Sequence, residues 1–162
     1  MSLRNLYTDV ILDHYKNPRN KRAVENPTHH AKGHNPLCGD KLELYVRVAD
    51  GLIEDIGFTG QGCAIHTAST SIMTEKVKGR TLAETKDVIA AFLGMVVGRT
   101  DISEELLGEL VVLEGVKDLH ARIKCATLSW HTIDLALFQG EAAKVGDSSA
   151  AATEDAQGLE ME

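Results

Sequence analysis

The chain has 162 residues, of which 43% are hydrophobic and 25% are charged, values that suit one globular domain with a buried core. Its formal net charge is −7, and residues 141–162 hold six acids and one lysine, so this tail alone contributes −5. An acidic chain without a basic stripe argues against nucleic acid or an anionic membrane as the main partner. We see no secretory signal and no apolar run of the roughly 20 residues that span a bilayer. Three cysteines cannot all pair with one another, so we expect a reducing, cytoplasmic compartment.

The first part of the chain predicts a helix, a loop and a strand. Apolar residues recur at helical spacing over residues 3–15, and the pair Asn17-Pro18 ends this helix. Residues 21–35 are polar, hold three of the seven histidines and predict a long loop. Strict alternation of apolar and polar residues over 42–48 then predicts a half-buried strand.

A hairpin and an ambiguous segment come next. The pair Asp50-Gly51 is a hairpin turn signal and predicts a second strand over residues 52–59. This strand leads into a glycine-rich loop at residues 60–62. Residues 63–67 fit either a short third strand or a loop, because they show neither period clearly.

The second half of the chain predicts helices. Gly79 stops the first of them, and a capping box of Thr81 and Glu84 starts the second. The predicted helices cover residues 68–78, residues 82–97, a short segment through 106–107, and residues 124–138. A hairpin followed by helices favours an α+β domain over residues 1–140, with a small antiparallel sheet of about three strands packed by several helices. Residues 142–162 lack periodicity and are expected to be disordered.

Three cysteines and one aspartate form a candidate metal site. Cys38 and Cys63 follow turn residues, Asp40 stands two residues after Cys38, and Cys125 lies at the predicted start of the last helix. Three sulfurs and one oxygen make a complete tetrahedral set for a soft or borderline metal. A lone cysteine is more often an inert small hydrophobe, but thiols at exposed turns need protection from oxidation, which a bound metal provides. The intervals of 25 and 62 residues between the cysteines match no zinc-finger pattern, so local context carries this prediction.

Charge around the third cysteine favours the same interpretation. A zinc ion with three thiolates and one carboxylate has a net charge of −2, and Arg122 and Lys124 flank Cys125 in sequence. A helix beginning near Cys125 would also favour thiolate over thiol. The plainer alternative for both cations is an ordinary solvated helix start. His66 and His120 are alternative ligands, but each is more simply a surface or capping histidine.

Taken together, the motifs resemble the U-type iron–sulfur cluster assembly proteins (the NifU/IscU-like family) and, within them, the SufU branch. The stretches that carry this resemblance are Tyr7-x3-Ile11-x-Asp13-His14-Tyr15-x-x-Pro18-Arg19-Asn20, Asn35-Pro36-x-Cys38-Gly39-Asp40, Gly60-x-Gly62-Cys63-x-Ile65-x-x-Ala68-Ser69-x-Ser71-x-Met73-Thr74 and Ala121-Arg122-Ile123-Lys124-Cys125-Ala126-Thr127-Leu128-Ser129-Trp130. They span residues 7–130 in order, and only the tail lies outside them. Shorter, scaffold-type relatives carry histidine where this chain has Lys124, and they lack most of residues 92–115.

The resemblance implies a SufE/NifU-like fold in which Cys38, Asp40, Cys63 and Cys125 surround one zinc ion. It also implies that Cys38 accepts persulfide sulfur from a SufS-like cysteine desulfurase, for delivery to the downstream SUF assembly machinery. Because zinc damps a thiolate's nucleophilicity, Cys38 would have to leave the metal while the other three ligands hold it.

Three alternatives to this function remain. A scaffold would assemble a transient [2Fe–2S] cluster on the same residues, since thiolates suit either metal. A zinc hydrolase needs an open coordination position, which four protein ligands would fill. A structural zinc domain would tolerate Cys38→Ser. Residues 98–118 hold six acids and two bases, which indicates a solvated face, with a docking surface as the alternative.

Overall fold

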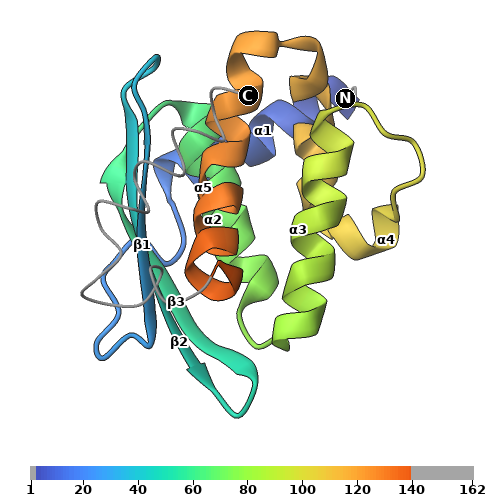
Figure 1. Ribbon diagram of the computed structural model, residues 1–162. Coiled ribbons are helices and arrows are strands. Elements are labelled where there is room, and N and C mark those ends of the chain that lie inside the picture. Colours follow the sequence, from blue (N-terminus) through green and yellow to red (C-terminus); the bar gives the residue numbers. More distant parts are fainter. Residues whose placement is uncertain (1–2, 140–162) are drawn as a thin grey trace.

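The computed structural model describes residues 3–139, in which helices cover one face of a three-stranded antiparallel sheet (Figure 1). Helices α2 and α5 lie next to the sheet, and α3 lies beyond them. The elements are α1 (Leu3–Lys16), β1 (His29–Asn35), β2 (Asp40–Ala49), β3 (Leu52–Gln61), α2 (Ala64–Val77), α3 (Leu82–Val96), α4 (Glu104–Leu107), the 3-10 helix η1 (Gly108–Asp118) and α5 (His120–Phe138). The expected α+β architecture is therefore confirmed, whereas the acidic tail at 141–162 lies outside the described residues.

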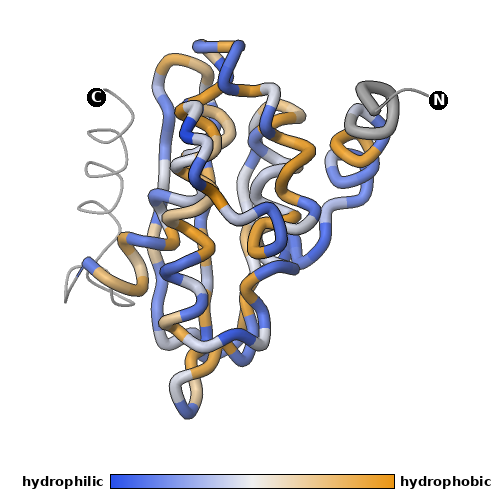
Figure 2. Tube along the Cα trace, turned by 90° about the vertical axis from the view of Figure 1, so that its right-hand side faces the viewer, coloured by the Kyte–Doolittle hydropathy of each residue, from blue (hydrophilic) through white to orange (hydrophobic). Residues whose placement is uncertain are grey.

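The sheet runs in the order β1-β2-β3, and its central strand supplies much of the core. Leu42, Leu44 and Val46 of β2 alternate with more exposed residues and point toward the helices. Figure 2 shows the same mixing of hydrophobic and hydrophilic residues along the strands and helices, as elements with one buried face require. At the tight turn after β2, Asp50 and Gly51 both have positive φ, which confirms the predicted hairpin.

The prediction of a loop over residues 21–35 is wrong for its last seven residues, which form β1. This strand carries histidines, alanine and glycine instead of β-branched residues, so it has no local strand signal. Its inward face packs on α5: Ala31 is fully buried, and a Cβ at Gly33 would collide with Oγ1 of Thr132. Close approach of a helix therefore selects small residues here, and the contact is visible only in the tertiary structure.

Two helices begin earlier than the sequence indicates. Helix α2 starts at Ala64, so residues 64–67 are neither strand nor loop, and Cys63 is its N-cap. Helix α5 starts at His120, which places Cys125 in the second turn and not at the helix start. Both starts lack a standard cap signal, because cysteine is an unusual N-cap and Leu119 makes no side-chain cap bond. By contrast, the capping box of Thr81 and Glu84 is formed and α3 begins where predicted.

The segment at 98–118 has a solvated acidic face, as expected, and also an apolar face that enters the core. Leu107, Leu110 and Leu113 are buried, whereas Glu109 between the first two and Glu114 directly after the third are exposed. Further inside, the rings of Phe92 and Trp130 stack with their centroids 4.3 Å apart. None of the helices within residues 3–139 is long and apolar enough to cross a membrane.

Candidate metal centre

The four expected metal ligands lie on four different structural elements that meet at one end of the sheet. Cys38 lies in the β1–β2 turn, and Asp40 is the first residue of β2. Cys63 caps α2 immediately after β3, and Cys125 comes from the second turn of α5. The antiparallel pairing brings the β1–β2 turn and the end of β3 to the same end of the sheet, where α5 also passes (Figure 1).

Three of these residues form a compact group. The sulfurs of Cys38 and Cys125 are 3.3 Å apart, and both lie within 4.8 Å of a carboxylate oxygen of Asp40. Cys63 lies beside this group without being a member of it. Its backbone N–H donates to Asp40 Oδ1 at 3.0 Å, and its sulfur shares a hydrogen bond with Cys125.

The burial of the group leaves one carboxylate oxygen unsatisfied. Asp40 and Cys125 are fully buried, Cys63 is partly buried and Cys38 is exposed. Oδ2 of Asp40 has no hydrogen-bond partner among the described residues, which costs about 1–3 kcal/mol for a buried polar atom. Gly62 leaves room for this carboxylate, since a Cβ there would lie 2.7 Å from Asp40 Oδ1. An inward-facing carboxylate oxygen next to two sulfurs, with a third close by, fits a zinc ion or an iron–sulfur cluster.

The thiols divide into a stronger and a weaker acid. The hydrogen bond from Cys125 lowers the pKa of Cys63 to about 6, and the backbone N–H of His66 adds to this effect at 3.5 Å. The same hydrogen bond, together with burial, raises the pKa of Cys125. The expectation that a helix start favours the Cys125 thiolate is therefore wrong. The N-terminal position with its N–H donor belongs to Cys63 on α2.

The two expected cations are present but in different places. Nη1 of Arg122 donates to the sulfur of Cys125 at 4.0 Å, and the neighbouring sulfurs raise the pKa of Arg122. Lys124 instead lines an open hollow of about 490 Å³ beside Cys38. The hollow is bordered by Asn35, Leu37, Cys38, His120, Ala121, Arg122 and Lys124. It gives solvent access to the side of the site where the exposed cysteine stands.

Two residues near the site have roles that the sequence did not indicate. His66 is buried, not a surface histidine, and its Nδ1 has no hydrogen-bond partner among the described residues. Burial lowers the pKa of His66, which favours the neutral ring. Asn35 is fully buried and donates from Nδ2 to the Cys38 sulfur at 2.8 Å. The Asn-Pro pair before Cys38 signals a turn, but nothing in the sequence shows that the amide reaches the thiol.

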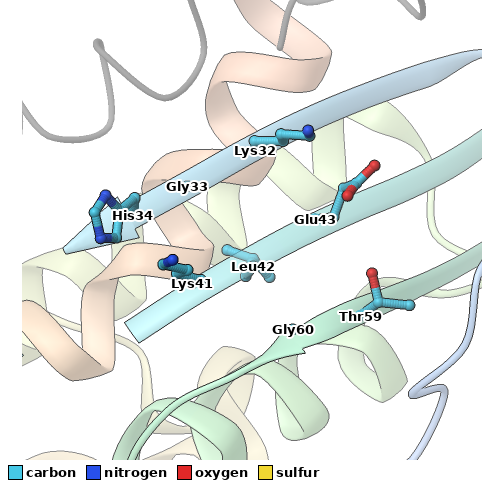
Figure 3. A pocket seen from close by; sticks show the side chains of 8 residues that line it. All are labelled: Lys32, Gly33, His34, Lys41, Leu42, Glu43, Thr59 and Gly60. Atoms are coloured by element: carbon cyan, nitrogen blue, oxygen red, sulfur yellow. The ribbon is translucent and has the colours of Figure 1, made fainter. Parts of the chain in front are cut away.

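A second hollow, of about 330 Å³, lies on the sheet. Figure 3 shows Lys32, Glu43 and Thr59 on three neighbouring strands along it, with His34 and Lys41 nearer the strand ends. Side chains of both charge signs line it, and no cysteine does. Of the four candidate ligands, Cys38 borders the hollow of about 490 Å³ described above.

Comparison with known proteins places this arrangement in one family. The family model of the NifU-like N-terminal domain matches residues 6–126. The zinc-dependent sulfurtransferase SufU of Bacillus subtilis (strain 168) is 39% identical over 140 residues, covering 86% of this chain and 95% of that protein. The iron–sulfur cluster assembly scaffold protein IscU of Streptococcus pyogenes serotype M1 is 38% identical over 135 residues, covering 83% of this chain and 84% of that protein. The crystal structure of the SUF-system protein FiSufU from Fervidobacterium islandicum AW-1 aligns with a TM-score of 0.78 at 32% identity, covering 84% of this chain and 99% of that one. The chain therefore belongs to the NifU-like N-terminal domain family.

Proposed function

We propose that this protein is a zinc-dependent sulfur acceptor in iron–sulfur cluster assembly, working in a reducing cytoplasm. It takes persulfide sulfur from a SufS-like cysteine desulfurase and passes it to the downstream SUF machinery. Cys38, Asp40, Cys63 and Cys125 hold the zinc, and Cys38 is also the acceptor. One observation carries this proposal: the exposed Cys38 sulfur stands 3.3 Å from the buried Cys125 sulfur and close to Asp40, whose Oδ2 has no hydrogen-bond partner among the described residues. The similarity to the sulfurtransferase SufU supports it.

Sulfur transfer is an exchange between two S–S bonds. The Cys38 thiolate attacks the terminal sulfur of the desulfurase persulfide, and a new S–S bond forms on Cys38 as the old one breaks. The products are Cys38–S–SH and the desulfurase cysteine thiolate. Charge and protons therefore balance, and no external oxidant or reductant is needed. An attacking sulfur must approach in line with the bond it breaks, which suits an exposed turn better than a helix or the core.

The surrounding residues divide the work between holding and reacting. When bound, zinc keeps its thiol ligands deprotonated and reduces their nucleophilicity. Asp40 and Cys125 are fully buried and Cys63 is tied to both, so these three would stay in place. Cys38 alone has the exposure needed to reach another protein. Arg122 offsets negative charge at the buried sulfurs, while Lys124 places positive charge in the hollow that an anionic persulfide would enter.

The test of this function is persulfide formation on Cys38. Incubation with a cysteine desulfurase and cysteine, followed by mass spectrometry, is expected to add one sulfur to the wild-type protein. The Cys38→Ala variant should take up none and should not stimulate desulfurase turnover. Gly115→Ala is a matched control, because a Cβ at this exposed position meets no atom within 4 Å. Full stimulation by Cys38→Ala would refute the acceptor role.

The second candidate is a scaffold that carries a transient [2Fe–2S] cluster, as the name of the Streptococcus pyogenes relative suggests for that protein. The same observation favours it, because three thiolates and a carboxylate suit iron as well as zinc. Metal analysis of protein purified without oxygen separates the two. About one zinc per chain without visible absorbance supports the sulfur acceptor, whereas stoichiometric iron and sulfide support the scaffold.

A further inference from the structure

The side chain of Asn35 is fixed at both of its ends. It lies at the end of β1 and is fully buried. Its Oδ1 accepts a hydrogen bond from the backbone N–H of Leu37 at 3.1 Å, and its Nδ2 donates to the Cys38 sulfur at 2.8 Å. The N–H of Leu37 can only donate, so Oδ1 must face it and the amide N–H groups must face the sulfur. The orientation of this amide is therefore set by its own turn.

These two bonds serve different purposes. The bond from Leu37 closes a side-chain turn of the kind that aspartate or serine would also form. A separate backbone bond from Gly39 N–H to the Asn35 carbonyl, at 2.8 Å, closes the turn from the main chain. The turn thus has two closures that do not involve Nδ2. The hydrogen bond from Asn35 Nδ2 to Cys38 is not needed to form the turn, so its effect is on the Cys38 sulfur.

We propose that Asn35 is the positioning residue for Cys38. Its N–H holds the sulfur in the direction of Cys125 and Asp40 while zinc is bound, and it compensates negative charge on the sulfur when Cys38 leaves the metal to attack. The first of these roles rests on the zinc site of the proposed function, and the second rests on its sulfur transfer. Hydrogen bonds that orient a metal ligand in this way commonly change metal affinity by about 10- to 100-fold when they are removed.

The location of Asn35 supports both roles. Buried as it is, its amide cannot exchange the sulfur for bulk water without cost, so the contact persists as other groups move. Asn35 also borders the hollow that contains Cys38 and Lys124. Arg122 contacts the buried sulfur of Cys125 instead. The neutral amide of Asn35 thus donates to the sulfur that has to move, while the cation Arg122 donates to a buried sulfur that stays.

Two variants separate positioning from turn formation. Asn35→Ser keeps an acceptor for the Leu37 N–H but is too short to reach Cys38. Asn35→Asp keeps the shape and the acceptor but replaces the donor with a carboxylate oxygen. Zinc affinity is measured with the metal alone, by competition with a chromophoric chelator. Maximal desulfurase stimulation and the half-saturating protein concentration are measured separately, with Gly115→Ala as the control.

The zinc affinity of both variants is expected to be lower than that of wild type by roughly tenfold or more. Asn35→Asp is expected to have the lower zinc affinity of the two. Maximal stimulation, measured at saturating zinc, should fall about tenfold, while the half-saturating concentration stays unchanged. Wild-type zinc affinity and wild-type stimulation in both variants would overturn the inference, because this result is expected if Asn35 only forms the turn. A change confined to the half-saturating concentration would overturn it as well. If the wild-type protein itself accepts no sulfur, the proposed function fails, and the zinc measurement still decides the role of Asn35.

Discussion

Gly33→Ala is expected to destabilise the fold and the metal centre together. Gly33 lies on β1 where α5 crosses the sheet. A Cβ there would collide with Oγ1 of Thr132 and would lie 3.1 Å from Cδ1 of Leu128 and 3.2 Å from Cδ2 of Leu42. Thr132 cannot simply turn away, because it is buried and its hydroxyl donates to the Leu128 carbonyl at 2.7 Å. Helix α5 must therefore move away from the strand.

The size of the effect follows from two opposing terms. Adding a methyl group to a packed interior costs about 1–3 kcal/mol. Replacing glycine by alanine within a strand returns about 0.5–1 kcal/mol, because the unfolded chain loses conformational freedom. We therefore expect a net loss of about 1–2 kcal/mol in the free energy of unfolding. Since α5 carries Cys125 while the β1–β2 turn carries Cys38, the same displacement should weaken zinc binding.

Urea unfolding of the zinc-free protein measures the first effect, and chelator competition measures the second. Gly115→Ala is the control and should change stability by less than about 0.5 kcal/mol. Combining Gly33→Ala with Thr132→Ala removes the colliding hydroxyl, so the double variant should be more stable than the sum of the two single changes predicts, by about 1 kcal/mol. A Gly33→Ala protein as stable as Gly115→Ala, or additivity of the Gly33→Ala and Thr132→Ala changes, would contradict a steric conflict between Gly33 and Thr132.

Cys125→Ser should lower zinc affinity by roughly tenfold or more. His14, Glu75 and Glu109 also have ligand atoms within 4.8 Å of one another, but His14→Gln should leave the zinc content unchanged. If metal analysis finds zinc lost from His14→Gln alone, the metal lies at the His14 group and not at the cysteines. The hydrogen bonds from Arg22 and Lys78 lower the pKa of Asp55 to about 2. The contribution of Asp55 to the free energy of unfolding is therefore present above pH 4 and is lost as the pH falls toward 2. Urea unfolding between pH 2 and 6 should show a decrease in this free energy on the order of 1 kcal/mol that is absent in Asp55→Asn. Thr81→Ala removes the cap of α3 and should cost about 1 kcal/mol in thermal or urea unfolding, while Thr81→Ser should cost much less.

Much of the fold could be predicted because its signals are local. The strand over 42–48, the Asp50-Gly51 turn and the capped helix after Thr81 each depend on residues a few positions apart, and all are present. The same holds for the turn around Cys38, whose exposure was expected from its neighbours. Patterns of this kind are set by side-chain period, turn chemistry and capping, which need no distant partner.

The predictions that proved wrong concern elements whose structure depends on contacts between residues far apart in the chain. Strand β1 has no period of its own and depends on pairing with β2 and on the close approach of α5. The starts of α2 and α5 carry no standard cap, so the positions of Cys63 and Cys125 within their helices were misjudged. The N–H donor of a helix start was therefore expected at Cys125, whereas it lies at Cys63. The donor that faces Cys38 was missed for the same reason, because an amide three residues away can point in many directions.

Residue identity along the chain fixes the available chemistry: three thiols and one carboxylate, of which Cys38, Asp40 and Cys63 stand beside turn residues. The tertiary structure divides that chemistry among the four residues. It buried Asp40 and Cys125, tied Cys63 to both, and left Cys38 exposed beside the amide of Asn35. Burial and hydrogen-bond partners differ among these residues because they depend on elements that are far apart in the chain and meet at one end of the sheet. Residue identity is local, whereas the environment that buries one cysteine and exposes another is not.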